Sequence, residues 1–231
     1  MFSVRVVSTS GAESGTDLSG RARLRDAAIA RFAREGFGAS LRSIAADAGV
    51  SAALVIHHFG SKERLRAECD EHVFAVIRTS KSEVIAAPGG PGVLLAQLAK
   101  VEEYAPLVAY VVRSLQAGGD TARRFVEHVV ADAVRYIAEG VEAGVIKPSR
   151  DEEARARYLA EASLGALMLE LAMNRPEDPQ DLSALLSTYL DKLALPALEL
   201  FTQGFLTDRA MLDTYLLYVG DPPEGAGGRT G

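Results

Sequence analysis

Helical periodicity along nearly the whole chain limits its possible folds more than any other feature. Apolar residues recur every three or four residues, whereas the alternation typical of β-strands occurs only in a short stretch at residues 4–7. Pro148, Pro176, Pro179 and the Pro- and Gly-rich residues 88–92 fall between the periodic segments and mark connections, because proline cannot continue a helix. The pattern predicts an all-α fold with helices at residues 20–35, 41–48, 52–58, 62–86, 92–103, 105–117, 120–143, 151–174, 182–203 and 207–218.

Composition argues against secreted and membrane-spanning proteins. The 231 residues include a single cysteine, Cys69, so the chain cannot form an internal disulfide. The longest apolar run, residues 105–112, is much shorter than the roughly 20 residues of a membrane span, and the N-terminus lacks the apolar stretch of a signal peptide. We therefore expect a soluble, cytoplasmic protein. Residues 1–19 and 220–231 are rich in small and polar residues and are expected to be disordered tails.

Positive charge is concentrated in one segment of an otherwise acidic chain. The formal net charge is −6, yet residues 20–66 hold nine Arg and Lys residues against four Asp and Glu residues. A basic segment attached to an acidic remainder is typical of a module that binds a polyanion such as nucleic acid. We therefore expect two domains, a basic one at residues 20–66 and a larger helical one at residues 67–219.

Turn-forming and capping residues in the basic segment predict a helix-turn-helix. Gly36 is suited to end the first helix, and Ser40 is suited to cap the second. After the second helix, Gly49 can adopt the left-handed conformation of a tight turn, Val50 can fill the space between helices, and Ser51 can cap the third helix. Two short helices joined in this way form the helix-turn-helix motif.

The third predicted helix has one face for the core and an opposite face that begins with small residues. Val55 and Phe59 are expected in the core, whereas the opposite face contains Ala52, Ala53, Leu54, Ile56 and His57. Small residues near its N-terminus allow the backbone to approach base edges in a major groove. Ser61 begins the next helix, whose free N–H groups and Lys62 are suited to bind a phosphate.

The same segment resembles the tetracycline-repressor-like (TetR/AcrR) bacterial transcription regulators. The resemblance is carried by Ala28, Phe32, Gly36, Ser40, Ile44, Ala45, Ala48, Gly49, Val50, Ser51, His58, Phe59, Ser61, Lys62, Glu63 and Leu65. It implies an N-terminal three-helix DNA-binding head, a long linking helix, and an all-helical body for ligand binding and dimerisation. The implied function is a ligand-responsive regulator, expected to be a repressor, that binds palindromic double-stranded DNA as a homodimer and is released by a small apolar effector.

The motif and the resemblance together give a set of candidate DNA contacts. These are Arg42, Ser43, Ser51, Ala52, Ala53, Leu54, Ile56, His57, His58 and Lys62. One position departs from the family, which usually has a tyrosine where this chain has Ile56, and that tyrosine typically contacts the DNA backbone. In this chain the contact is either lost or replaced by the neighbouring histidines.

Two long segments of the body are candidates for a dimer interface. The resemblance implies that the last two long helices of each subunit form a four-helix bundle with its partner. At three- and four-residue steps, the two segments carry Tyr158, Ala162, Gly165 and Leu169, and Leu182, Leu186, Tyr189 and Leu193. The alternative is that both helices are ordinary core of one subunit.

Polar residues inside apolar segments of the body are candidates for an effector site. The predicted helix 105–117 is apolar nearly all round but contains Tyr110 and Arg113, and the apolar stretch 164–173 contains Glu170. A buried charge is costly unless it is paired, so Arg113 and Glu170 either pair with each other or face a cavity. In the second case, Tyr104, Tyr110, Arg113 and Glu170 would be the polar anchors of an apolar pocket.

Other function classes have weaker support in the sequence. It contains no nucleophile elbow, P-loop or HExxH motif, so we expect no catalytic residues and no cofactor. His57 and His58, with Cys69 and His72 further along, lack the paired spacing of a structural zinc site, so no metal is expected. The alternatives are a helical-bundle enzyme, which requires a convergent polar cluster in the body, and an architectural DNA-binding protein without an effector.

Overall fold

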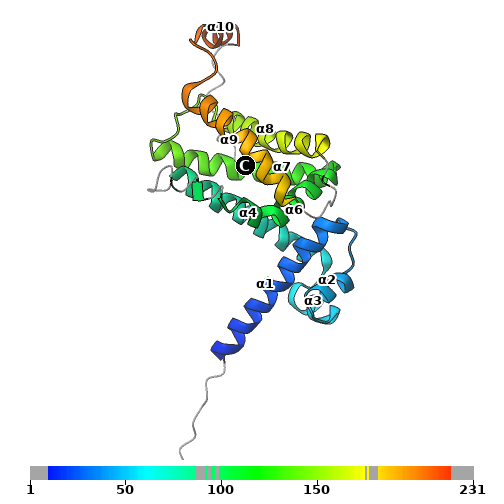
Figure 1. Ribbon diagram of the computed structural model, residues 1–231. Coiled ribbons are helices and arrows are strands. Elements are labelled where there is room, and N and C mark those ends of the chain that lie inside the picture. Colours follow the sequence, from blue (N-terminus) through cyan, green and yellow to red (C-terminus); the bar gives the residue numbers. More distant parts are fainter. Residues whose placement is uncertain are drawn as a thin grey trace, which may run out of the picture.

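The computed structural model describes residues 10–86, 92, 95, 96, 99–174, 176 and 182–219. Within these ranges the chain is helical and contains no strand, which confirms the predicted all-α class. The elements shown in Figure 1 are α1 (Ser10–Glu35), α2 (Leu41–Asp47), α3 (Ala52–Phe59), α4 (Lys62–Ala86), the 3-10 helix η1 (Val101–Tyr104), α6 (Ala105–Gln116), α7 (Gly119–Glu142), α8 (Glu152–Met173), α9 (Ser183–Gln203) and α10 (Ala210–Val219).

Two predicted segments differ from the structure. The first helix begins at Ser10 instead of residue 20, so residues 10–19 are helical where a disordered tail was expected. Figure 1 shows these first turns projecting away from the other helices. Residues 10–19 contain only Ala12 and Leu18 as apolar residues, so the sequence offered no helical periodicity to detect there. Residues 93, 94, 97 and 98 of the predicted helix 92–103 lie outside the described residues, and its last three residues belong to the 3-10 helix η1, which ends one residue later at Tyr104. The predicted tails at residues 1–9 and 220–231 also lie outside the described ranges.

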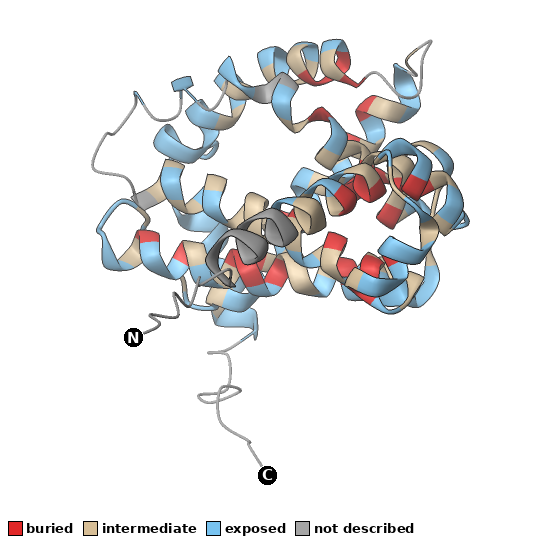
Figure 2. Cartoon of the chain, turned by 90° about the horizontal axis from the view of Figure 1, so that it is seen from below, coloured by how far each residue is buried: buried red, intermediate tan, exposed pale blue. Residues whose placement is uncertain are grey.

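The helices form a small head and a larger body, with α4 running from one to the other (Figure 1). In the head, α1 packs on α2 and α4, and α2 packs on α3. In the body, α7 packs against both α4 and α8, and α6 lies between α7 and the C-terminal part of α1. Buried residues gather on the faces where helices meet (Figure 2). No described helix combines the length and apolar character required to cross a lipid bilayer.

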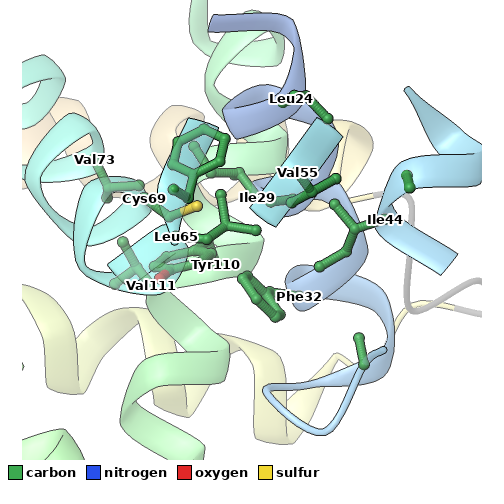
Figure 3. Close-up of a cluster of buried hydrophobic side chains, with 14 of the residues drawn as sticks. Leu24, Ile29, Phe32, Ile44, Val55, Leu65, Cys69, Val73, Tyr110 and Val111 are labelled. Carbon is green, nitrogen blue, oxygen red and sulfur yellow. The ribbon is translucent and has the colours of Figure 1, made fainter. Parts of the chain in front are cut away.

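One hydrophobic core extends from the head into the body. Its head residues include Leu24, Phe32, Ile44, Val55 and Phe59, and they continue without interruption into Leu65, Cys69 and Val73 of α4 and Tyr110 and Val111 of α6 (Figure 3). Because interiors are densely packed, a shift of α4 or α6 in the body is transmitted to the head. A second cluster joins α6, α8 and the start of α9 through Ala105, Val112, Leu167, Leu182 and Leu186.

Candidate nucleic-acid interface

The turn between α2 and α3 has the predicted capping geometry. The hydroxyl of Ser40 accepts a hydrogen bond from the Ser43 N–H at 3.1 Å, and the hydroxyl of Ser51 accepts one from the Leu54 N–H at 3.2 Å. Between them Gly49 has φ +68°, a conformation that residues with a side chain rarely adopt. A helix-turn-helix therefore forms where the sequence predicted it.

The third helix buries one face and exposes the other. Val55 and Phe59 lie in the core, whereas the predicted groove-facing residues Ala53, Leu54, Ile56 and His57 are exposed and Ala52 and His58 are half-buried. Leu54 and Ile56 are 37% and 44% exposed and lie on the same short helix. An apolar, protruding face of this kind is suited to contact thymine methyl groups in a major groove.

The candidate phosphate contacts flank this exposed face. Arg42 on α2 and Ser51 at the start of α3 are exposed, and Ser43 and Lys62 are half-buried. Within the described part of the chain neither Arg42 nor Lys62 forms an ion pair, so both charges are available to an outside anion. Ser61 accepts a hydrogen bond from the Arg64 N–H at 3.2 Å and so caps the start of α4 beside Lys62.

Arg21, which was not among the candidate residues from the sequence, holds α3 in place. Arg21 on α1 donates to the backbone carbonyl of His58 at 3.0 Å and pairs with Glu68 on α4. The Arg21 guanidinium holds the pKa of the Glu68 carboxyl below its usual value, and it also lies 4.9 Å from the ring centre of Phe59. Arg21 therefore links α1, α3 and α4. The only signal for this role in the sequence was the general excess of positive charge.

Part of the positive charge in the head is used for packing and is not offered to DNA. Arg31 and Arg34 on α1 both reach Asp47 at the end of α2, with Arg31 Nε at 2.7 Å and Arg34 Nη2 at 2.8 Å from Asp47 Oδ2. The hydrogen bond from Arg31 lowers the pKa of the Asp47 carboxyl. These pairs fix α2 on α1, and a count of basic residues alone overstates the charge facing outward.

The body contacts the head mainly through α6. Tyr110 is fully buried, and its hydroxyl donates to Asp70 Oδ1 on α4 at 2.6 Å. Its ring packs edge-on against Phe37 at 5.5 Å between ring centres, next to Phe32 in the shared core (Figure 3). Burial raises the pKa of Asp70 despite this hydrogen bond, and burial together with Asp70 also raises the pKa of Tyr110.

Arg113 binds the end of α1. Its guanidinium donates to the carbonyl oxygen of Ala33 at 3.1 Å and to that of Arg34 at 3.0 Å. These carbonyls lie in the last turn of α1, where the helix dipole is negative, so the arginine acts as a cap from a different domain. Of the two alternatives, the pairing of Arg113 with Glu170 is wrong, because Arg113 bonds backbone carbonyls of α1 that no sequence pattern reveals.

The four predicted effector residues do not meet in one place. Tyr110 and Arg113 lie at the junction with the head, whereas Glu170 is buried on α8 and pairs with Lys192 of α9 at 2.9 Å. The amide of Asn174 also donates to Glu170 at 2.9 Å. Tyr104 is half-buried in η1, which packs on α9. The structure thus separates the set into a junction pair and a pair beside the second apolar cluster.

The predicted dimer residues also divide into two groups. On α8, Tyr158, Ala162, Gly165 and Leu169 are all exposed, as an interface between subunits requires. On α9, Leu182 and Leu186 are buried in the second cluster, with Tyr189 packed against it, so this face belongs to the core of one subunit. Leu193, one turn further, is exposed. The prediction for the first half of α9 is wrong because one apolar stripe cannot reveal which neighbour covers it.

Possible metal ligands and the single cysteine bear on the alternative of a metal or thiol site in the described part of the chain. In these ranges no three His, Cys, Asp or Glu side chains come together as a metal site would require. Cys69 is fully buried in the shared core, and burial raises the pKa of its thiol, which leaves it protonated and unreactive at neutral pH.

Comparison with known proteins gives matches to both parts of the chain. The family model for bacterial regulatory proteins of the tetR family matches residues 24–69, and the model for the tetracyclin repressor-like C-terminal domain matches residues 102–207. The HTH-type transcriptional regulatory protein RaaS of Mycobacterium tuberculosis is 51% identical over 200 residues, which cover 87% of this chain and 93% of the relative.

Solved structures share the fold at lower identity. SmeT, the repressor of the Stenotrophomonas maltophilia multidrug efflux pump SmeDEF, has a TM-score of 0.51 at 20% identity, covering 74% of this chain and 89% of SmeT. A complex of SmeT with triclosan has the same TM-score at 19% identity, covering 75% and 91%. A TetR-family transcriptional regulator from Pectobacterium atrosepticum has a TM-score of 0.51 at 21% identity, covering 87% and 99%. With its helix-turn-helix head and helical body, this chain belongs to the TetR family of bacterial transcription regulators.

Proposed function

We propose that this protein is a cytoplasmic, ligand-responsive repressor that binds a palindromic operator as a homodimer. The observation that carries the proposal is the geometry of the head, in which a capped helix-turn-helix presents the exposed residues Ala53, Leu54 and Ile56 on one helix face. Small and aliphatic side chains on a recognition helix allow close approach to base edges.

The DNA contacts divide into positioning and reading residues. In this proposal Arg42, Ser43 and Lys62 bind phosphates on either side of the groove, and phosphate contacts determine position without reading sequence. Ala53 and Leu54 on α3 contact bases. His57 takes over the backbone contact that a tyrosine usually makes in this family at the position of Ile56.

The exposed face of α8 supports a two-fold dimer. Tyr158 and Leu169 are 71% and 62% exposed, and a Cβ atom placed on Gly165 would meet nothing within 4 Å in its own subunit. A small residue between large exposed apolar ones allows two helices to approach closely. A two-fold axis along this face would place two recognition helices on half-sites about 34 Å apart, one turn of DNA.

The second apolar cluster is the proposed effector site. The residues Val108, Ala109, Met168 and Leu171 are only partly buried around it, and the ion pair of Glu170 with Lys192 lies at its edge. A small apolar effector with one polar group fits this chemistry. Because α6 contributes to this cluster and also holds α1 through Arg113, a ligand that shifts α6 moves the head.

Selection of binding sites from random duplex DNA tests the operator proposal. We expect enriched sequences with two half-sites related by a two-fold axis. Enrichment of single, unpaired sites would contradict the dimeric repressor, and binding without sequence preference would favour an architectural protein.

A thermal-shift screen of apolar acids, phenols and drugs tests the effector proposal. A true effector should stabilise the protein, release the selected DNA and lose affinity for the Glu170→Gln variant. A compound that releases DNA from both proteins equally would place the effector site elsewhere.

A further inference from the structure

The last helix is apolar on nearly every side, and none of its residues is buried by the described part of its own subunit. Apart from Ala210, Asp213 and Thr214, every residue of α10 is a large aliphatic or aromatic one. None of them is buried, and the side chains of Leu217 and Tyr218 are 89% and 87% exposed. Figure 1 shows α10 beyond the end of α9 and apart from the body. A helix that is hydrophobic all round needs cover on most of its surface.

The segment before α10 directs it away from α9. Gly204 ends α9 with φ +81°, and its N–H donates to the carbonyl of Leu200 at 3.0 Å. Residues 204–209 then form an irregular connection that can span up to about 20 Å when extended. The hydrogen bonds around this connection are local, from the Ala210 N–H to Asp208 and from Arg209 to Asp213. The connection is therefore long enough to carry α10 to a neighbouring molecule.

A matching uncovered surface lies on the same chain. The second half of α9 exposes Leu195, Leu198, Leu200 and Phe201, and the last turns of α8 expose Leu169 and Met173. Uncovered apolar surface of this extent is rare on a monomer and marks an interaction site. Both α9 and α10 thus have exposed apolar residues that a partner with an apolar surface could cover.

Charge distinguishes a protein partner from a lipid surface. Helices that lie on membranes carry Lys and Arg on a polar face, which attract anionic lipids. Residues 204–219 contain only Arg209 as a basic residue, against Asp208 and Asp213, and α10 has no separate polar face. A second copy of the chain, by contrast, offers an apolar surface on both sides of an inserted helix.

We propose that α10 is an exchanged arm, which crosses the dimer axis and packs on the outer half of α9 and the end of α8 of the second copy. Exchange covers the apolar surface of α10 and that of α9 in one step. It also makes the two subunits intertwined. The same two subunits, and therefore their two heads, stay together when an effector changes the shape of the body. The inference rests on the proposed dimer through α8, which it extends to the C-terminal helix.

Photochemical cross-linking with isotope mixing tests the exchange directly. One batch of full-length protein carries p-benzoylphenylalanine in place of Tyr215, a second unmodified batch is labelled with ¹⁵N, and the two are mixed under conditions that allow subunits to exchange. The expected product is a covalent dimer in which residue 215 of the unlabelled chain is joined to a ¹⁵N peptide from residues 183–203 or 152–173. The same probe in place of Val145, an exposed residue in the turn after α7, should give no such product.

Several outcomes would overturn the inference. Cross-links confined to one chain would show that α10 folds back onto its own subunit. If phosphatidylglycerol vesicles are added and the residue 215 probe cross-links to lipid instead of protein, the partner of α10 is a lipid surface. Sedimentation provides a second measurement, in which removal of residues 205–231 should raise the dimer dissociation constant at least tenfold, whereas removal of residues 220–231 should not. An equal constant for both truncations would also overturn it. DNA site selection reports on the proposed operator separately, because covalent dimers can form whether or not the head binds a palindrome.

Discussion

Replacement of Arg113 by methionine tests how the body holds the head. The Arg113→Met change keeps an unbranched apolar stem but removes both hydrogen bonds to the carbonyls of Ala33 and Arg34. A hydrogen bond contributes about 1 kcal/mol net, and the favourable interaction of a cation with the end of a helix adds a few tenths of a kcal/mol. The expected loss in the free energy of unfolding is therefore about 2 kcal/mol, since both bonds are partly buried.

Differential scanning calorimetry at one fixed protein concentration measures this loss. For a chain of this size about 1 kcal/mol corresponds to roughly 2–4 °C, so the Tm should fall by about 4–8 °C. Concentration must be equal because the melting temperature of a dimer depends on it. The matched control is Arg123→Met, which breaks an ion pair with Asp120 whose arginine side chain is 73% exposed, and such pairs contribute little. A fall for Arg113→Met no larger than that of the control would refute the capping role.

Two further changes test the interface and the buried junction. Gly165→Trp should leave the subunit folded, because nothing lies within 4 Å of the added Cβ, yet separate the close-packed α8 helices, so light scattering should detect monomers; a persistent dimer would move the interface elsewhere. Burial raises the pKa of Asp70 in the folded protein, so wild-type stability should fall as pH rises from about 4, where an unfolded Asp ionises, through the higher folded-state pKa. The Asp70→Asn variant keeps an acceptor for the Tyr110 hydroxyl but has no group that must ionise in the buried site, so it should be more stable than wild type at pH 7. Denaturant titrations should show that this advantage in the free energy of unfolding vanishes below pH 4. An advantage independent of pH would contradict this account.

Local signals predicted the head correctly because its structure depends on neighbours in the sequence. The caps at Ser40 and Ser51 and the turn at Gly49 act within three or four residues, and each lies where its residue type requires. The buried stripe with Leu24, Ala28 and Phe32 likewise follows from helical spacing alone. The family resemblance rests on these same positions.

Contacts between distant segments were not predictable from the same signals. Arg113 and Glu170 were each correctly recognised as charges in apolar surroundings, but their partners, the end of α1 and Lys192, depend on how α6, α8 and α9 pack. The apolar periodicity of residues 182–193 correctly indicated a covered helix face, yet Leu182 and Leu186 pack in the core of their own subunit. Periodicity shows that a helix face is covered but not which helix covers it.

The salt dependence of operator affinity tests the central claim most directly. If α3 enters the major groove with phosphate contacts from Arg42 and Lys62, log K should fall linearly with log salt, by about 0.9 for each neutralised phosphate. Lys62→Ala and Arg42→Glu should each weaken binding to all sequences and reduce this slope, by about 1 for the loss of one contact, whereas Arg123→Ala on the body should leave it unchanged. If Lys62→Ala and Arg42→Glu both retain the affinity and slope of wild type, the proposed docking of the head on DNA is wrong.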